Sequence, residues 1–294
     1  MPWTDAMRAG RWADAWALET ATIAGRDPTM RDDPALPYHR RWVWDGRAVA
    51  DRDVLVRCYH GLGDTIQFAR YLPVLAARAR SVTLEVQPSL IPLLSGMGAS
   101  DIVPFDVARP LPPSDCDIEI TELPCALGVA PDAVAIPYIA SPPAAVAGGT
   151  IGLCHRAGDW DAERSFAADL LRPIAERHAC AMLATGATTL PVTNPAGCPA
   201  DMGETAALVA AVDLVITVDT MIAHLAGAMG RPTWLLLKAE PDWRWSPDRR
   251  DTPWYPTMRL YHQPRPGDWA TVLATVAAEL SPVHPHRSPA PWPA

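Results

Sequence analysis

Short apolar segments alternate with helical segments along most of this 294-residue sequence. We expect strands at residues 54–58, 82–86, 117–120, 150–154, 180–184, 214–218, 233–237 and 258–261. The helices expected between them lie at 65–79, 167–178, 205–211, 222–229 and 269–280. Segment 214–218 is apolar except for Thr217, which is typical of a strand covered on both faces. The alternation predicts an α/β fold with parallel sheets, because parallel strands need crossover connections.

The alternation occurs twice, on either side of a segment at 140–149 that is rich in Ala, Ser, Pro and Gly and is typical of a linker. We therefore expect two Rossmann-like domains, at 51–147 and 148–282, which face each other across a cleft. Residues 283–294 are expected to form a disordered tail.

The first 50 residues differ from the rest of the chain. Segment 10–19 is helical in pattern, and Pro28 follows Ala15 by thirteen positions, a spacing that suggests one incomplete tetratricopeptide (TPR) unit. An ordinary N-terminal helix is the alternative interpretation. A single unit cannot bury its own apolar face, so this TPR-like extension should pack on the following domain or belong to a longer array, and it is a candidate site for a protein partner.

Charge and composition exclude several classes of protein. The chain has 25 Lys and Arg residues and 33 Asp and Glu residues, so its net charge is 25 − 33 = −8. Nucleic acid is therefore a poor candidate partner, because binding to its phosphate backbone requires clustered positive charge. The N-terminus has no signal peptide h-region, and no apolar run reaches the ~18–20 residues of a transmembrane segment. The six Cys residues form no C-x-x-C pair, so we expect reduced thiols in a cytoplasmic protein rather than disulfides or a zinc site.

The motif at 60–65, His-Gly-Leu-Gly-Asp-Thr, follows the first expected strand. It resembles part of the dinucleotide fingerprint G-x-G-x-x-G, and Glu85 stands near the position of the acid that binds ribose. However, Ile66 replaces the third glycine, and Asp64 would repel a pyrophosphate by roughly 4 kcal/mol at ~4 Å and an effective dielectric near ~20. We therefore reject NAD or FAD binding here, and interpret Asp64 as a helix cap, a general base facing the cleft, or both.

A second motif begins at the end of strand 214–218 with Asp219 and Thr220, and His224 follows one helical turn later. The free N–H groups and the positive dipole end of a helix form a binding site for phosphate. Thr220 is placed to cap the helix or to donate to a phosphate oxygen. His224 is either a structural residue or a second contact to the same anion.

Two loops at strand ends complete the candidate site. The loop at 156–166 contains Arg164, which suits bidentate binding of a diphosphate, although a surface arginine is the alternative. Its Asp-Trp-Asp sequence at 159–161 resembles a metal-binding D-x-D, but we favour no metal. The loop at 241–256 contains Trp243 and Trp245, whose rings suit stacking on a sugar or a base, and the alternative is a rigid structural loop.

Three of these segments together resemble a bacterial family. The stretches at 61–71, 218–227 and 241–259 are similar to glycosyltransferase family 9, which includes the ADP-heptose:lipopolysaccharide heptosyltransferases and is often found downstream of tetratricopeptide repeats. The resemblance covers roughly residues 40 to 280 and implies a GT-B architecture, with the acceptor on the first domain and the nucleotide-sugar donor on the second.

The resemblance also implies roles for individual residues. Asp64 matches the catalytic base of the heptosyltransferases, and Arg164 matches the basic residue that neutralises the leaving diphosphate. On the acceptor side, the cleft loop comprises His60, Gly61, Gly63 and Gln67. On the donor side, the expected binding residues are Arg164, Asp219, Thr220, Met221, Ile222, His224, Trp243 and Trp245. The family carries glycine or another small residue after its Asp-Thr, whereas this chain has Met221 and Ile222, whose bulk is expected to alter donor choice or to signal lost activity.

We therefore expect an inverting glycosyltransferase of hexosyl or heptosyl type that needs neither a metal nor a cofactor and uses a nucleoside diphosphate-sugar as donor. The acceptor is a glycan, a lipid-linked glycan or a protein hydroxyl. The alternative is a non-catalytic module that binds a nucleotide-sugar or a protein partner.

Overall fold

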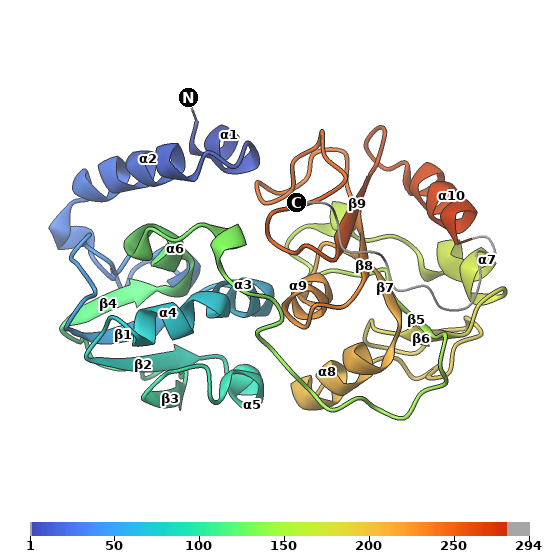
Figure 1. Cartoon of the computed structure of the whole chain (residues 1–294), viewed down its shortest axis with the longest axis horizontal. Helices are drawn as coiled ribbons and strands as arrows, with labels where there is room; N and C mark the ends of the chain where they lie inside the picture. The colour runs from blue at the N-terminus through green and yellow to red at the C-terminus, as the bar shows by residue number, and fades with distance from the viewer. Residues whose placement is uncertain (1, 281–294) are drawn as a thin grey trace.

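The computed structural model describes residues 2–280 as two α/β lobes, each built on a parallel sheet (Figure 1). The first sheet has the order β3-β2-β1-β4, with β1 at Asp53–Arg57, β2 at Ser81–Val86, β3 at Asp101–Pro104 and β4 at Cys116–Glu119. The second has the order β6-β5-β7-β8-β9, with β5 at Ile151–Cys154, β6 at Cys180–Met182, β7 at Leu214–Val218, β8 at Thr233–Leu237 and β9 at Met258–His262. These sheets confirm the expected α/β class. The tail expected at 283–294 lies outside the described residues.

The helices of the first lobe are shorter than the sequence suggests. They are α3 at Leu62–Phe68, α4 at Leu72–Ala76, α5 at Ile91–Leu94 and α6 at Leu123–Leu127, with 3₁₀ turns at Ala69–Tyr71, Pro88–Leu90, Ile120–Glu122 and Pro131–Ala133. The helix predicted at 65–79, with a kink at Pro73, is instead formed by two short α-helices joined by a 3₁₀ turn, from Leu62 to Ala76. Pro73 lacks the N–H of a helix interior, so α4 starts anew with this proline at its second position. The pattern also missed β3, a short edge strand whose residues are only partly buried.

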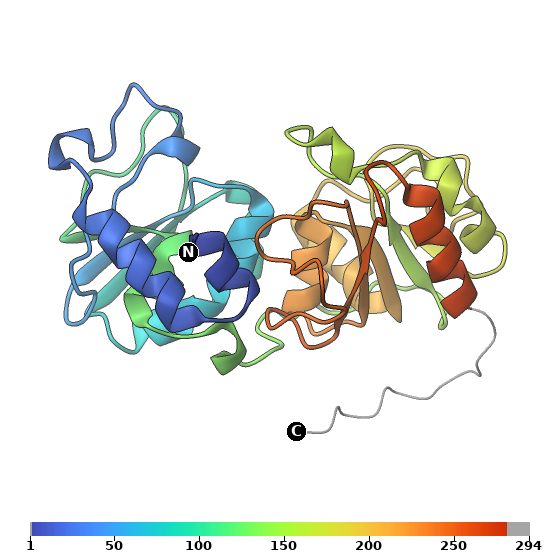
Figure 2. The same cartoon turned by 90° about the horizontal axis from the view of Figure 1, so that it is seen from above.

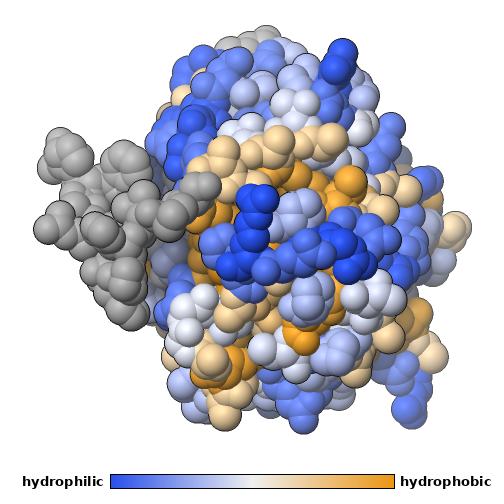
Figure 3. Space-filling view, turned by 90° about the vertical axis from the view of Figure 1, so that its right-hand side faces the viewer, coloured by the Kyte–Doolittle hydropathy of each residue, from blue (hydrophilic) through white to orange (hydrophobic). Residues whose placement is uncertain are grey.

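The second lobe follows the predicted alternation more closely. Its helices are α7 at Arg172–Ala175, α8 at Met202–Ala211, α9 at Met221–Ala228 and α10 at Trp269–Glu279, with 3₁₀ turns at Ala162–Arg164 and Ala168–Leu171. The helix predicted at 167–178 is instead a 3₁₀ turn at Ala168–Leu171 followed by α7, which begins with Pro173 at its second position because proline lacks the N–H of a helix interior. Figure 3 shows the outer end of this lobe, where hydrophilic residues lie beside hydrophobic ones.

Two N-terminal helices, α1 at Trp3–Arg8 and α2 at Trp12–Ala24, lie over the first lobe (Figure 2), and 3₁₀ turns at Pro28–Met30 and Tyr38–Arg40 follow them. They also reach the second lobe. Arg8 donates from Nη2 to the Pro241 carbonyl at 2.8 Å, and the rings of Trp3 and Trp243 meet edge to face with centroids 4.8 Å apart. The extension therefore packs on both lobes.

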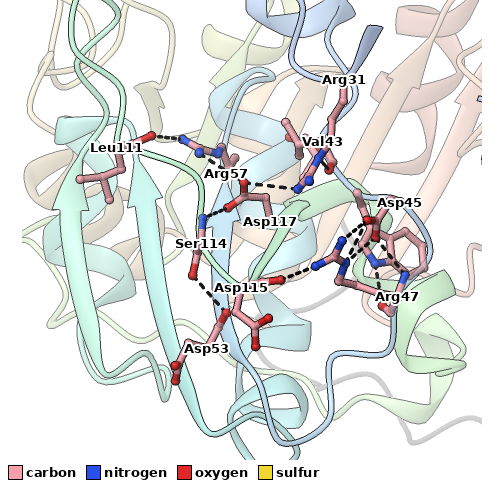
Figure 4. A network of polar contacts seen from close by, with 12 residues as sticks. Arg31, Val43, Asp45, Arg47, Asp53, Arg57, Leu111, Ser114, Asp115 and Asp117 are labelled. Atoms are coloured by element: carbon pink, nitrogen blue, oxygen red, sulfur yellow. Dashed lines mark hydrogen bonds and ion pairs between the residues drawn. The ribbon is translucent and has the colours of Figure 1, made fainter. Parts of the chain in front are cut away.

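A polar network fastens the segment after α2 to the first sheet (Figure 4). The buried guanidinium of Arg57 on β1 lies 2.8 Å from Glu85 on β2 and 3.6 Å from Asp117 on β4. Arg31, from the segment after α2, approaches the same Asp117 carboxylate at 3.4 Å. Because a buried charge is costly unless it is paired, these contacts stabilise one arrangement of the segment. Glu85 is 1% exposed, and its carboxylate also accepts a hydrogen bond from the Leu111 N–H. Both of its carboxylate oxygens therefore have partners inside the first lobe.

The two lobes meet where α3 packs on α9 (Figure 1). Gly63 makes this approach feasible: a Cβ at this position would lie 2.9 Å from His224 Cδ2 and 3.4 Å from Met221 Cα. Nearby, the fully buried Arg70 of the first lobe donates to the Trp254 carbonyl of the second at 2.8 Å and lies over the Tyr255 ring. The lobes therefore form a packed junction, and the carboxyl ends of both sheets open beside it.

Candidate functional site

A cavity of about 920 Å³, here called the larger cavity, opens between the N-terminal helices, the strand ends of the first sheet and the loop after β8. The N-terminal segment contributes Trp3, Met7, Trp16, Glu19, Thr22, Arg26, His39, Arg41 and Trp42. The first lobe contributes Tyr59, His60, Gly61, Asp64, Phe68, Glu119, Thr121, Glu122 and Pro124, and the second Trp160, Asp242, Trp243 and Arg244. Aromatic rings beside carboxylates are typical of a surface that binds sugars or other polar organic groups.

Asp64 occupies the third position of α3, at the junction and in the wall of the larger cavity. Its Oδ2 accepts from the Gly61 N–H at 3.0 Å, which satisfies a free donor at the helix start. Its Oδ1 pairs with Arg244 of the other lobe, and the side chain keeps 29% of its exposure. The carboxylate therefore caps α3 and faces the cavity at the same time.

Arg244 is a central residue of the site that the sequence motifs did not single out. It reaches from the loop after β8 to α3, where Nε donates to Gln67 Oε1 at 2.6 Å, and Nη1 donates to Asp242 at 2.9 Å. The guanidinium lies 4.4 Å from the centre of the Trp243 ring. Burial alone would lower the pKa of Arg244, but the carboxylates of Asp64 and Asp242 raise it. This cation therefore joins the two lobes directly beside Asp64.

Other titratable groups in the larger cavity are shifted by burial. Burial raises the pKa of Glu119 to about 8 and that of Glu19 to about 7. His60 Nε2 lies 3.9 Å from Glu119 Oε2, and burial lowers the pKa of His60. Near neutral pH this wall therefore carries carboxyl groups close to their titration points.

A smaller cavity of about 220 Å³ lies at the carboxyl ends of β5, β7 and β8. Its lining residues are Trp160, Asp161, Arg164, Asp219, Leu236, Leu237, Lys238, Glu240, Pro241 and Asp242. Two of them, Trp160 and Asp242, also line the larger cavity, so the two cavities adjoin. This is the edge of a parallel sheet at which α/β proteins bind their ligands.

Arg164 and Asp219 lie together in the smaller cavity. Arg164 Nη1 donates to the Asp219 carbonyl at 3.0 Å, and its guanidinium stacks on the Trp160 ring at 4.1 Å. Arg164 Nε has no hydrogen-bond partner within residues 2–280. Burial, aided by Asp242, raises the pKa of Asp219 to about 6. The loop after β5 thus places a partly unsatisfied guanidinium beside the start of α9.

The first turn of α9 is more enclosed than the sequence motif suggests. Thr220 is the N-cap residue, but its side chain makes no capping hydrogen bond. Ile222 and His224 are 3% and 5% exposed and are not among the residues that line the two cavities. His224 Nδ1 lies 3.0 Å from the Tyr255 hydroxyl, and burial lowers its pKa well below the ordinary value. In this structure His224 is a neutral packing residue, and Met221 is half-buried against Gly63.

The remaining predicted residues divide between cavity and core. His60, Gly61 and Trp243 line the larger cavity, whereas Gln67 is fully buried behind Arg244. Trp245, two residues after Trp243, is also fully buried and stacks on His224 with ring centroids 5.8 Å apart. Trp245 is therefore a structural residue of the loop at 241–256, whereas Trp243 lines the larger cavity.

The described part of the chain, residues 2–280, contains no group of three His, Cys, Asp or Glu side chains arranged to hold a metal. This range includes the Asp-Trp-Asp sequence at 159–161. Within the same residues, no helix has the length and apolar character needed to cross a membrane.

Residues 174–250 match the family described as Glycosyltransferase family 9 (heptosyltransferase). A curated relative, Protein FlbA of Caulobacter vibrioides (strain ATCC 19089 / CIP 103742 / CB 15), is 38% identical over 81 residues, which are 28% of this chain. The matched part of this chain spans only 13% of the length of that relative.

Two solved structures share the fold. A glycosyl transferase family 9 protein from Veillonella parvula DSM 2008 has a TM-score of 0.55 at 12% identity, covering 74% of this chain and 87% of that one. The E. coli heptosyltransferase WaaC, solved with ADP-2-deoxy-2-fluoro heptose, has a TM-score of 0.52 at 13% identity, covering 77% of this chain and 99% of that one.

Residues 174–250 are therefore similar to glycosyltransferase family 9, and the two lobes share the GT-B fold of these two solved structures.

Proposed function

We propose that this protein transfers a sugar from a nucleoside diphosphate-sugar to the hydroxyl group of an acceptor. One observation carries the proposal: the larger cavity, which contains Asp64, adjoins the smaller cavity, which contains Arg164, through the shared residues Trp160 and Asp242. A carboxylate and a guanidinium group of the kind that binds phosphate therefore lie on either side of one boundary. The family match over 174–250 supports the same reaction class.

The donor is proposed to bind the second lobe, which corresponds to 148–282. Arg164 and the first-turn N–H groups of α9, beside Asp219 and Thr220, would hold its diphosphate, since a helix N-terminus and a guanidinium both favour phosphate oxygens. These donors would also stabilise the negative charge of the leaving diphosphate without a metal. Met221 would contribute its backbone at this turn. Ile222, His224 and Trp245 would support the turn from behind.

The acceptor is proposed to bind the first lobe, which corresponds to 51–147, in the larger cavity. Its hydroxyl would donate its proton to Asp64 as the oxygen attacks the anomeric carbon. Attack from the face opposite the leaving diphosphate inverts the configuration at that carbon. Trp243 and the other rings of the larger cavity would stack on the sugars. Arg244, paired with Asp64, would fix the position of the carboxylate beside the acceptor hydroxyl.

The proposal is tested in two steps. A thermal-shift screen with nucleoside diphosphates identifies the base, and release of that nucleoside diphosphate from the matching sugar donors then measures turnover. Asp64→Asn should reduce turnover at least ~100-fold, in line with loss of a general base, while nucleotide binding persists. The matched control is Asp53→Asn, because Asp53 is an exposed carboxylate on β1 that pairs with Arg80. Equal turnover by Asp64→Asn and the control would refute the assignment.

The second candidate function is a non-catalytic module that binds a nucleotide-sugar. It is favoured by the bulk of Met221 at the start of α9 and by the ion pair that already engages Asp64. Binding of a nucleoside diphosphate with no release from any sugar donor, with or without cell-derived acceptors, would select this function.

A further inference from the structure

Lys238 lies at the carboxyl end of β8, where it lines the smaller cavity. It is the only lysine in the sequence. It follows β8 directly, as Asp219 follows β7 and His155 follows β5. The register of the strands aligns these ends, because Val218 on β7 pairs with Leu236 on β8. Lys238 and Arg164 are the two basic residues among those that line the smaller cavity. Neither the motifs nor the resemblance identified Lys238.

The ammonium group of Lys238 is paired with the loop that carries Arg164. Its Nζ lies 2.9 Å from Asp161 Oδ2 and 3.2 Å from Glu163 Oε2. The Glu163 side chain is 79% exposed, so that pair contributes little, whereas Asp161 is 14% exposed. Asp161 also lies 3.8 Å from Arg164 Nε, and so a single carboxylate approaches both cations of the smaller cavity.

We propose that Lys238 is a second phosphate-binding residue: its ammonium group exchanges Asp161 and Glu163 for the diphosphate of the donor, which it holds together with Arg164. This inference rests on the proposed function, because it places the donor diphosphate in the smaller cavity. A diphosphate presents more negative charge and more acceptor oxygens than the Asp161 carboxylate, so it competes for the same ammonium. When the diphosphate dissociates, Lys238 pairs again with the Asp161 and Glu163 carboxylates, and this exchange favours release of the leaving group.

A purely structural role for Lys238, in which it only fastens the loop at 156–166, predicts a different response to mutation of Asp161. If Lys238 only holds the loop, Asp161→Asn and Lys238→Met weaken diphosphate binding alike. If Lys238 binds phosphate, Asp161→Asn removes its internal competitor and tightens diphosphate binding. Asn keeps the acceptor for the Glu163 N–H, which lies 3.2 Å from Asp161 Oδ1, so the 3₁₀ turn is retained.

Calorimetric titration of the full chain with inorganic pyrophosphate and with ADP measures these effects. Lys238→Met should weaken pyrophosphate binding about 10- to 100-fold, the loss expected for one charge-assisted hydrogen bond. Lys238→Arg should retain most of the affinity, and Asp161→Asn should increase it several-fold. Arg172→Met is the matched control, because Arg172 is a basic residue of the same lobe that pairs with Asp169 outside the cavity, and its affinity should equal that of the wild type.

Chemical labelling gives a second readout that folding defects do not mimic. Pyridoxal 5′-phosphate followed by borohydride modifies primary amines, which in this chain are Lys238 and the N-terminal amine. Pyrophosphate should protect Lys238 in the wild-type protein, with the N-terminal amine as internal reference. Equal labelling of Lys238 with and without pyrophosphate would overturn the inference.

The outcomes separate the two proposals. If the wild type binds neither pyrophosphate nor any nucleoside diphosphate of the screen at millimolar concentration, both proposals are overturned. If the wild type binds and Lys238→Met binds equally well, or if Asp161→Asn weakens binding as Lys238→Met does, the role of Lys238 is overturned while the donor site stands.

Discussion

Replacement of Arg244 by methionine tests the junction on which the site depends. Met keeps much of the aliphatic volume but leaves three partners without their donor: the Asp64 carboxylate, the Asp242 carboxylate and Gln67 Oε1. The Arg244 side chain is 11% exposed, so water replaces these contacts only in part. The variant therefore loses the charged bridge between α3 and the loop after β8.

The magnitude follows from the burial of this ion pair. Removal of one partner of a buried pair costs about 3–5 kcal/mol, and the carboxylates left behind, 29% exposed at Asp64 and 25% at Asp242, regain only part of their hydration. With an unfolding entropy of about 2.1 cal/mol/K per residue, a chain of this length should lose roughly 5–8 °C in melting temperature. Arg244→Lys should recover only part of the loss, because an ammonium cannot reproduce the fork of contacts to Asp64, Asp242 and Gln67.

Urea unfolding followed by tryptophan fluorescence and calorimetry measures the effect. Arg249→Met is the matched control, since Arg249 lies in the same loop but forms an exposed pair with Asp251, which is worth at most about 1 kcal/mol. A double-mutant cycle with Asp64→Asn isolates the coupling between the two lobes. Equal free energies of unfolding for Arg244→Met and Arg249→Met would refute the claim that the ion pairs of Arg244 stabilise the junction between the lobes.

Two other substitutions test the packing and the charge of the site. Gly63→Ala should destabilise the protein by about 1–3 kcal/mol, because its Cβ would lie too close to His224. Gly25→Ala is the control and should not destabilise it, since the nearest atom to its Cβ would be 3.5 Å away. Chemical unfolding compares the two variants, and equal losses of stability would exclude close packing at Gly63. Glu19 has a pKa of about 7 in the folded protein against 4.5, so its contribution to stability is complete below pH 4.5 and is lost as the pH rises through 7. Glu19→Gln should therefore match the wild type near pH 4.5 and exceed it in stability by about 2–3 kcal/mol at pH 8; a constant difference between pH 4.5 and 8 would contradict the shift.

The sequence pattern was sufficient for the buried strands, but it was insufficient for the edge strand β3 and for several helices. The predicted strands at 214–218 and 233–237 have the bounds of β7 and β8, because buried parallel strands are marked by continuous apolar runs. The helices predicted around Pro73 and Pro173 are divided into shorter segments. Proline lacks the N–H that a helix interior needs, and this outweighs the helical spacing of the apolar residues.

Sequence motifs identified some residues of the candidate site but not those whose contacts form only between the lobes. Asp64 and Arg164 were identified because each follows a strand and carries a charge suited to its chemistry. Arg244 was missed because its partners on α3 lie about 180 residues earlier, and no local pattern reports a contact between lobes. Trp243 and Trp245 could not be separated from sequence, since their different burial depends on how the loop turns at the junction.

A crystal structure with the nucleoside diphosphate selected by the binding screen tests the central claim most directly. The account predicts the diphosphate in the smaller cavity, with its oxygens within hydrogen-bond distance of Arg164 and of the first-turn N–H groups of α9, and with the Asp64 carboxylate across the boundary formed by Trp160 and Asp242. A diphosphate bound anywhere else on the chain, with the smaller cavity unchanged at saturating concentration, would contradict it.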